Sequence, residues 1–301
     1  MKSGFVSILG RPNAGKSTLL NYLIGEKIAI VANKPQTTRN AIQGVMNAPD
    51  AQIVFLDTPG IHKADSLLNK RMMDTVRAAL EERDLLLFLV DATRRFGEED
   101  RHAAAILKRT ETPSLLVLNK TDLLGKNKGA LLPLIEHYKA LHEFVDFIPI
   151  SAQKGDGVDD LRKAIVDRLP EGPAYFPPDY ITDQPERFLA AEFIREKVLE
   201  ATRQEVPHSV AVMVDAWEDT PKLIRIFATI HVEKNGQKGI IIGAGGAMLK
   251  QIGTLAREEM EGMFGRKIYL DLRVKVMAGW RERPDFLEAL DWRTMSGTDE
   301  I

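Results

Sequence analysis

The sequence predicts an α/β domain with a mostly parallel sheet, followed by a smaller α+β domain. In the first half of the chain, short apolar runs alternate with amphipathic stretches, which is the pattern of repeated β-α units. In the second half, the predicted order of elements is α-β-β-α-α-β, and a proline-rich stretch separates the two halves. We therefore expect domains over residues 1–172 and 183–301, joined by a linker over residues 173–182.

The composition is that of an ordinary globular chain. Of 301 residues, 44% are hydrophobic and 28% are charged, and no apolar run approaches the roughly 18 residues that span a bilayer. The apolar run near the N-terminus leads directly into a glycine motif, so we expect no signal peptide. The absence of cysteine excludes disulfides and thiolate metal sites. A formal net charge of −2 provides no global basic field, so any surface for nucleic acid must be local.

The first predicted strand, residues 5–9, leads into a glycine-rich loop and then a helical stretch. The loop reads GRPNAGKS, and G-x-x-x-x-G-K-[ST] between a strand and a helix is the context in which this pattern binds phosphate. Main-chain N–H groups at the helix N-terminus are expected to face the β-phosphate. Lys16 is expected to reach the β- and γ-phosphates, and the Ser17 hydroxyl to bind Mg²⁺. The predicted phosphate-binding loop comprises Gly10, Arg11, Pro12, Asn13, Ala14, Gly15, Lys16, Ser17 and Thr18.

Two further segments are expected at the γ-phosphate. The polar stretch KPQTTRN, residues 34–40, is placed to supply a threonine to Mg²⁺; Thr38 is our choice and Thr37 the rival. The stretch QIVFLDTPG delivers Asp57 to the end of a strand, where it would hold Mg²⁺ through water, and the Gly60 N–H would face the γ-phosphate. The predicted metal ligands are Ser17, Thr38 and Asp57, and the second segment adds the nucleotide contacts Asp57, Thr58, Pro59, Gly60 and Ile61.

Base recognition is predicted after two later strands. SLLVLNKTD places Asn119, Lys120, Thr121 and Asp122 after a strand, and the Asp122 carboxylate can accept both N–H donors of the guanine edge. Adenine offers no such pair, so an unmatched carboxylate would reject it. The Lys120 stem would cover the base, and Asn119 would tie this loop to the phosphate loop. FIPISA ends a further strand at Ser151 and Ala152, where a main-chain N–H could bind guanine O6.

Taken in this order, the motifs resemble the translation-factor-like class of P-loop GTPases over residues 5–169. Ile61 stands where many small signalling GTPases carry a glutamine that orients the attacking water, so unaided hydrolysis should be slow. RPNAGKS resembles the loop of GTPases that recruit K⁺ through the asparagine; alternatively, Asn13 suits a tight loop for conformational reasons. The predicted catalytic residues are Asn13, Lys16, Thr38 and Gly60.

The proposed linker region contains five prolines between residues 169 and 188, so neither a helix nor a sheet can run through it. Its aromatic residues, Tyr175, Phe176 and Tyr180, are expected to pin it to a domain surface. Beyond it, residues 184–203 form an amphipathic helix, and LIRIFATIHVE and KIYLDLRVKVM alternate as strands with one buried face. In the last strand, the inward residues are expected to be Ile268, Leu270, Leu272, Val274 and Val276, and the outward ones Tyr269, Arg273 and Lys275.

A second glycine turn, GAGG from Gly243 to Gly246, joins the two central helices of this domain. Such a turn lets the main chain approach a sugar-phosphate backbone, beside a groove for about four single-stranded nucleotides. The other interpretation is a tight turn that only joins two helices. The pattern resembles a type II K-homology domain over about residues 190–280, although Ala244 and Gly245 stand where that family usually has a basic residue. The predicted RNA-binding residues are Lys238, Ile242, Gly243, Ala244, Gly245, Gly246, Lys250, Arg273 and Lys275.

A GTPase domain joined through PEGPAYFPPDYITD to a K-homology domain resembles the Era family over nearly the whole chain. GRPNAGKSTLLN, PQTTRN, DTPG, NKTD, ISA and RFLAAEFIREK carry this resemblance. It implies GTP and GDP as ligands with Mg²⁺, small ribosomal subunit maturation, and binding of the 3′ end of the small-subunit rRNA. It further implies a cytoplasmic monomer with partial, peripheral contact to the inner face of the cell membrane.

Two other functions are compatible with parts of the sequence. A metabolic P-loop kinase or ATPase would share the phosphate loop, but Asp122 and ISA speak against it. A GTP-regulated switch whose second domain binds protein would fit the near-neutral charge. The final stretch, residues 282–301, shows no chemistry and either covers the groove or frays.

Overall fold

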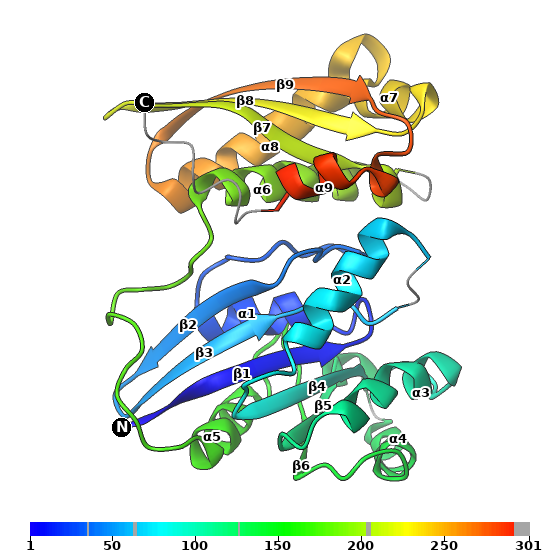
Figure 1. Ribbon diagram of the computed structural model, residues 1–301, viewed down its shortest axis with the longest axis vertical. Helices are drawn as coiled ribbons and strands as arrows, with labels where there is room; N and C mark the ends of the chain where they lie inside the picture. The colour runs from blue at the N-terminus through cyan, green and yellow to red at the C-terminus, as the bar shows by residue number, and fades with distance from the viewer. Residues whose placement is uncertain (35, 63–64, 126, 203–205, 292–301) are drawn as a thin grey trace. The chain divides into compact units, whose positions relative to one another are not determined.

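The computed structural model describes residues 1–34, 36–62, 65–125, 127–202 and 206–291, and the chain divides into two compact units (Figure 1). The first unit comprises residues 1–29, 38–65 and 69–183, and the second comprises residues 30–37, 66–68 and 184–301. The main boundary thus follows Asp183, and the expected linker belongs to the first unit. Nothing in the sequence indicates that residues 30–37 belong with the second unit.

The first unit is built on a six-stranded sheet in the order β2-β3-β1-β4-β5-β6, in which only β2 is antiparallel to its neighbour. Its interior strands are continuous apolar runs because helices cover both faces of such a sheet (Figure 1). The strands are β1 (Lys2–Gly10), β2 (Ile42–Ala48), β3 (Ala51–Asp57), β4 (Leu85–Asp91), β5 (Ser114–Asn119) and β6 (Asp146–Pro149).

The helices follow the predicted amphipathic stretches. They are α1 (Lys16–Ile24), α2 (Leu67–Ala78), α3 (Glu98–Ala104), α4 (Leu131–Lys139) and α5 (Val158–Arg168). One apolar core joins α2, α3 and α4 to β1, β4 and β5. α3 is continued directly by a 3₁₀-helix over Ala105–Arg109.

The proline-rich segment lies along the edge of the sheet, as its aromatic residues predicted. Tyr175 packs on Phe5 with ring centroids 4.7 Å apart, and Phe176 stacks on Tyr180 at 4.6 Å. The buried Gln52 side chain accepts hydrogen bonds from the N–H groups of Tyr175 and Phe176, at 2.6 and 3.0 Å. Because these contacts fix the segment to β3, it is an ordered part of the first unit.

The second unit has a three-stranded sheet in the order β7-β8-β9, with β7 antiparallel and β9 parallel to β8. Helices α6, α7 and α8 pack on one face and enclose a continuous apolar core (Figure 1). The elements are α6 (Glu186–Ala201), β7 (Ala211–Asp219), β8 (Leu223–Val232), α7 (Asn235–Ile242), α8 (Ala247–Phe264), β9 (Lys267–Val276) and α9 (Pro284–Ala289). This is the predicted order, with α9 added.

The alternation predicted for the strands is largely confirmed. Every inward residue of β8 is buried, and Tyr269, Arg273 and Lys275 of β9 are exposed. Of the predicted inward residues of β9, Ile268 and Val274 are buried, Leu270 and Leu272 are half-buried, and Val276 at the end of the strand is 38% exposed.

The C-terminal segment packs against part of the second unit's sheet, at His231 of β8. Phe286 of α9 packs on His231 at 4.9 Å, and the buried Trp280 donates from Nε1 to Ser209 O at 2.9 Å. His231 alternates with the core residues Ile230 and Val232, so it projects from the outer face of β8. The described part of this segment therefore does not cover a groove beside the glycine turn; residues 292–301 lie outside the described residues.

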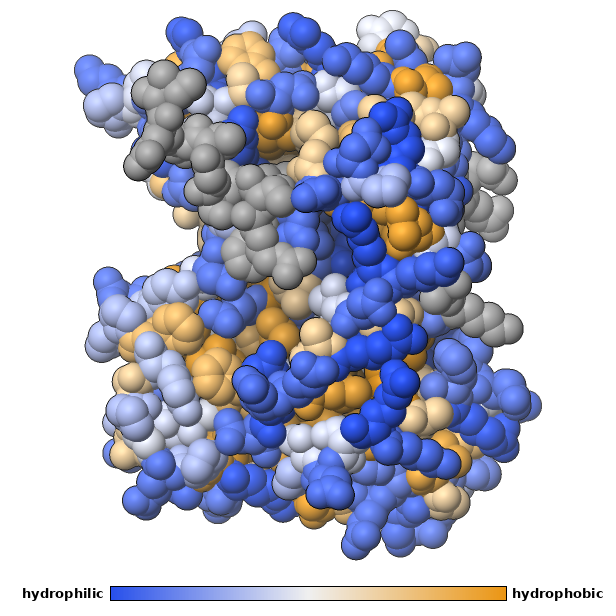
Figure 2. Space-filling model, in the orientation of Figure 1, coloured by the Kyte–Doolittle hydropathy of each residue, from blue (hydrophilic) through white to orange (hydrophobic). Residues whose placement is uncertain are grey.

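Within the described residues, no single helix is long and apolar enough to cross a membrane, although α7 and the stretch Ala244–Phe264 pass that test as a pair bent by 45°. In the view of Figure 2, hydrophilic residues predominate on the surface of each unit and surround smaller hydrophobic groups.

Candidate functional site

The predicted nucleotide motifs meet at one edge of the first unit's sheet. The phosphate loop follows β1, Asp57 ends β3, Asn119 ends β5, and Ser151 follows β6. All four strands run parallel, so their carboxyl ends lie at the same edge, where α/β sheets bind ligands.

Lys16 is enclosed by its own loop. Its ammonium donates to Gly10 O at 3.3 Å and to Arg11 O at 3.1 Å, and the residue is only 6% exposed. Burial lowers the pKa of Lys16 to about 8, although the nearby Asp57 carboxylate opposes that shift. The two carbonyls fix the position of the Lys16 ammonium but carry no net charge, so the ammonium can still bind an anion.

The three predicted metal ligands come together. The Ser17 hydroxyl donates to Asp57 Oδ2 at 2.6 Å and lies 2.8 Å from Thr38 Oγ1. The Thr37 hydroxyl points elsewhere and donates to Ala32 O and Lys34 O. This arrangement supports Thr38 over its rival.

The donor set fits a hard cation such as Mg²⁺, which prefers oxygen ligands. Asp57 is fully buried, and within the described residues its Oδ1 has no hydrogen-bond partner. Burial raises the pKa of Asp57 to about 6, while Lys16, Ser17 and Thr38 act to lower it. A cation at this position would bind the carboxylate oxygen that has no hydrogen-bond partner.

The segment after Asp57 packs against the phosphate loop. A Cβ on Gly60 would lie 2.7 Å from both the N and the Cγ of Pro12, so only glycine fits there. Ile61 is 4% exposed and donates from its N–H to Gly10 O at 3.0 Å. The buried Thr58 donates to Ile8 O at 2.8 Å. Ile61 and Thr58 therefore hold the segment in place.

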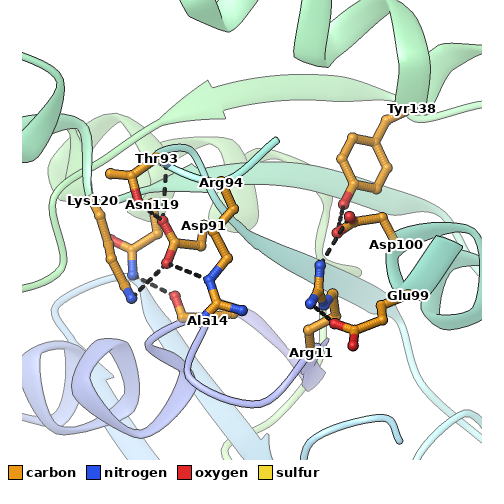
Figure 3. Close-up of polar contacts among 10 residues, drawn as sticks. All are labelled: Arg11, Ala14, Asp91, Thr93, Arg94, Glu99, Asp100, Asn119, Lys120 and Tyr138. Carbon is orange, nitrogen blue, oxygen red and sulfur yellow. Dashed lines mark hydrogen bonds and ion pairs between the residues drawn. The ribbon is translucent and has the colours of Figure 1, made fainter. Parts of the chain in front are cut away.

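Asn119 joins the base-recognition loop to the phosphate loop, as predicted. Its Nδ2 donates to Ala14 O at 2.8 Å (Figure 3). Its Oδ1 accepts from Ala152 N at 2.9 Å. A Cβ on Gly15 would lie 2.3 Å from Asn119 Nδ2, which explains that glycine.

Lys120 is held by a carboxylate that the sequence analysis did not include. Its ammonium lies 2.7 Å from Asp91 Oδ2 at the end of β4 (Figure 3). Burial would raise the pKa of Asp91, but hydrogen bonds from Lys120 and Thr93 hold it below its usual value. The rule that polar residues at strand ends form sites could have identified Asp91.

The guanine contacts differ in detail from the prediction. The half-buried Asp122 carboxylate has no hydrogen-bond partner within the described residues, so it is available to a ligand. The N–H groups of Ser151 and Ala152, however, already donate to Asp156 O and Asn119 Oδ1. A contact from either N–H to guanine O6 would have to share that donor.

Asn13 adopts a left-handed conformation, with φ of 62°. Asparagine tolerates this region better than most residues, so the conformational reason for Asn13 is present in the structure. This leaves its proposed role toward K⁺ as a separate prediction.

The second glycine turn has the conformation that glycine permits. Gly243, Gly245 and Gly246 have φ of 71°, 57° and 84°, and a Cβ on Gly245 or Gly246 would meet nothing within 4 Å. The main chain is thus open to a ligand at the N-terminus of α8, whose first turn has no side-chain cap.

A groove of about 390 Å³ lies beside this turn. Its walls are Gly246, Leu249, Lys250, Gly253, Thr254 and Arg257 on one side, and Leu270 and Leu272 of β9 on the other. Apolar walls with a basic rim suit bases and phosphates. Of these residues, Gly246 and Lys250 were predicted to bind RNA, and Leu270 and Leu272 were predicted on the inward face of the last strand.

Two predicted RNA-binding residues lie elsewhere. Arg273 and Lys275 alternate with Leu272 and Val274, so they project from the face of β9 opposite the groove. They do not line this groove, and their predicted role in RNA binding stays a prediction. Lys238, Ile242, Gly243, Ala244 and Gly245 belong to α7 and the turn but do not line the groove.

Comparison with known proteins identifies both units. A family model described as a 50S ribosome-binding GTPase matches residues 5–120, and a KH domain model matches residues 205–281. The GTPase Era of Geobacter metallireducens is 52% identical over 293 residues, covering 97% of this chain and 98% of that protein. The GTPase Era of Heliobacterium modesticaldum is 50% identical over 290 residues, covering 96% of each.

Two solved structures match over nearly the full chain. A single-residue variant of Aquifex aeolicus Era bound to GDP·AlF4⁻ is 43% identical, with a TM-score of 0.92 and coverage of 97% and 99%. Era in complex with MgGDPNP and nucleotides 1506–1542 of 16S ribosomal RNA is also 43% identical, with a TM-score of 0.93 and the same coverage. The similarity therefore spans both units rather than the nucleotide-binding fold alone.

Proposed function

The chain belongs to the Era family of GTPases, and we propose that it couples GTP hydrolysis to binding of the 3′ end of 16S ribosomal RNA during small-subunit maturation. Hydrolysis of GTP to GDP and phosphate is the activity of the family. The observation that carries the RNA proposal is the groove between α8 and β9 beside an open glycine turn. A related Era holds nucleotides of that RNA end.

The description of the matching family model refers to the 50S ribosome, but its match ends at residue 120. It therefore covers the nucleotide-binding part only and does not bear on which RNA the second unit binds. Our choice of the small subunit rests on the Era complex with 16S ribosomal RNA.

At the phosphates, the proposed binding groups are the main-chain N–H groups of the loop and the Lys16 ammonium. Ser17, Thr38 and Asp57 would hold Mg²⁺, which supplies positive charge to the β- and γ-phosphate oxygens. The Gly60 N–H would contact the γ-phosphate, and the tight approach of Gly60 to Pro12 supports that placement.

At the base, Asp122 would accept the two guanine donors while the Lys120 stem covers the ring. Asp91 supports this role because it fixes the lysine ammonium away from the base. An ATPase function is disfavoured, since adenine would leave the Asp122 carboxylate unmatched.

Ile61 has no group to orient water, so we propose that transition-state charge is stabilised in another way, with K⁺ bound through Asn13 as the candidate. Turnover in K⁺ should exceed turnover in Na⁺. Equal rates would remove Asn13 from the catalytic residues.

We further propose that the nucleotide state changes RNA affinity. Thr38, a proposed Mg²⁺ ligand, belongs to the first unit, while residues 30–37, which directly precede it in the chain, belong to the second. Ordering of Thr38 by GTP would therefore act directly at the junction of the two units. Identical RNA affinities with GDP and with a non-hydrolysable GTP analogue would contradict this coupling.

Two lysines give a direct test of the RNA groove. Lys250 lines it and Lys275 lies on the opposite face of β9, and both are exposed. We expect Lys250→Glu to weaken binding of a single-stranded RNA with the 16S 3′-terminal sequence about tenfold or more, and Lys275→Glu to change it less than twofold. Equal effects of the two substitutions, or no RNA binding by the wild-type chain, would contradict the proposed groove.

The family resemblance also suggests a cytoplasmic monomer that contacts the membrane surface in part. Co-sedimentation with anionic lipid vesicles, with and without salt, tests the membrane contact. Light scattering of the full chain tests the oligomeric state.

A further inference from the structure

Arg11 is the second residue of the phosphate loop, yet its side chain points toward α3 (Figure 3). Its Nη1 donates to Asp100 Oδ2 at 2.9 Å, and its Nη2 pairs with Glu99. The side chains of Arg11 and Asp100 are 17% and 9% exposed, whereas that of Glu99 is 78% exposed. Asp100 is therefore the principal partner, because solvent-exposed pairs contribute little.

Asp100 is itself held from several sides. Tyr138 donates its hydroxyl to Asp100 Oδ1 at 2.8 Å, and the Gly97 N–H donates to Oδ2 at 2.9 Å. Tyr138 is 1% exposed and lies among the rings of Phe88, Phe96 and Phe144. Burial and the Asp100 charge both raise the pKa of Tyr138, so its hydroxyl stays a donor. Both carboxylate oxygens thus have fixed partners in the core.

The main chain of Arg11 faces the nucleotide site. Its carbonyl accepts a hydrogen bond from Lys16 Nζ at 3.1 Å and another from Ala14 N at 3.3 Å. Arg11 is therefore anchored to α3 by its side chain and holds the phosphate-binding lysine by its carbonyl. A shift of Arg11 would move the lysine and the turn that contains Asn13.

We propose that Asp100, held by Tyr138, is a positioning residue for nucleotide binding: through Arg11 it fixes the start of the phosphate loop and the place of Lys16. The proposal rests on nucleotide binding at this loop. It also accounts for Arg11, whose guanidinium is engaged by carboxylates and so is not directed at phosphate. The competing explanation is a buried ion pair that only stabilises the fold, whose loss would lower stability without changing the site.

Asp100→Asn keeps the shape of the side chain and removes its charge. We expect it to raise the Kd of GDP and the KM of GTP about tenfold, with kcat changed less than about threefold, because the loop binds ground state and transition state alike. Tyr138→Phe removes only one hydrogen bond and should raise both constants about two- to threefold. The matched control is Glu98→Gln, on the same helix, whose carboxylate pairs with Arg101 at the surface.

A double-mutant cycle separates positioning from stability. If Asp100 acts through Arg11, then Arg11→Gln with Asp100→Asn should raise the Kd of GDP no further than the worse single substitution. Additive effects would overturn the proposal, as would a lowered Tm with unchanged Kd and KM in Asp100→Asn and Tyr138→Phe. If Asp100→Asn does not fold, Tyr138→Phe is measured alone: raised Kd and KM support the proposal, and a lowered Tm with unchanged Kd and KM overturns it. If the wild-type chain itself bound no GDP, that result would contradict the proposed nucleotide site and, with it, the role of Asp100.

Discussion

The Ser17 hydroxyl donates a hydrogen bond of 2.6 Å to Asp57 Oδ2, although 40 residues separate the two in the chain. Parallel pairing of β1 with β3 sets Ile8 beside Asp57, and the phosphate loop then returns Ser17 to the same point. Thr38 lies within 2.8 Å of the Ser17 hydroxyl. Three oxygen-bearing side chains from three separate segments of the chain therefore meet at one point.

Substitution of alanine for Thr38 or for Thr37 should show which of these two threonines acts at the metal site. We expect Thr38→Ala to slow Mg²⁺-dependent GTP hydrolysis about a hundredfold, because it removes a proposed metal ligand. Thr37→Ala should slow it less than about fivefold, since that hydroxyl donates to Ala32 O and Lys34 O rather than to the proposed metal ligands. Single-turnover hydrolysis over a Mg²⁺ titration measures both. A larger loss in Thr37→Ala would exchange the two roles.

Gly60 should tolerate no side chain. In Gly60→Ala the new Cβ would lie 2.7 Å from Pro12 N, closer than real Cβ contacts allow, so the phosphate loop or the DTPG segment must move. We expect GTP affinity to fall at least about tenfold with the fold retained, measured by titration calorimetry. Gly129→Ala is the control, because a Cβ there meets nothing within 4 Å. If Gly60→Ala bound GTP with wild-type affinity, the phosphate loop could move away from the new Cβ without loss of binding, which would contradict this prediction.

Much of the nucleotide site could be predicted because its parts are local. The phosphate loop and the segments at Asp57 and Asn119 each follow an apolar strand, and parallel strands bring their carboxyl ends together. The partners of these motifs are harder to predict. Asp91 ends β4, so its place at this edge of the sheet could have been predicted, but its pairing with Lys120 could not. Asp100 becomes a neighbour of Arg11 only when α3 packs beside the phosphate loop, and spacing along the chain carries no sign of that.

The RNA groove shows a different limit. Alternation along β9 correctly separated Leu270 and Leu272 from Arg273 and Lys275. The face with the leucines lines the groove, so Arg273 and Lys275 project from the opposite face. Which basic residues meet the groove therefore depends on the packing of α8 against β9, which charge along the chain does not show.

His231 should make the second unit sensitive to acid. Burial lowers the pKa of His231, Lys275 adds to the effect, and Asp215 opposes it. The unfolded chain then binds more protons than the folded chain between this lowered pKa and about 6.5, so stability falls as pH drops through that window. Urea unfolding followed by tryptophan fluorescence measures this unit, because Trp217, Trp280 and Trp292 all follow Asp183. His231→Gln should flatten the dependence; an unchanged slope would assign it to other groups.

Filling the groove should abolish RNA binding without unfolding the second unit. Gly253 lies on the groove wall of α8, and a Cβ there would meet only Leu272 Cδ1 at 3.4 Å, so Gly253→Leu projects its side chain into the space for bases. Gly262→Leu is a matched control on the same helix, outside the groove, and a Cβ there meets nothing within 4 Å. Both substitutions should gain up to about 1 kcal/mol of helix stability.

We expect RNA affinity, measured by fluorescence anisotropy, to fall at least about tenfold in Gly253→Leu and less than about twofold in Gly262→Leu. GTP affinity should be unchanged in both, because neither residue belongs to the first unit. Equal RNA affinities would place the RNA on another surface of the second unit.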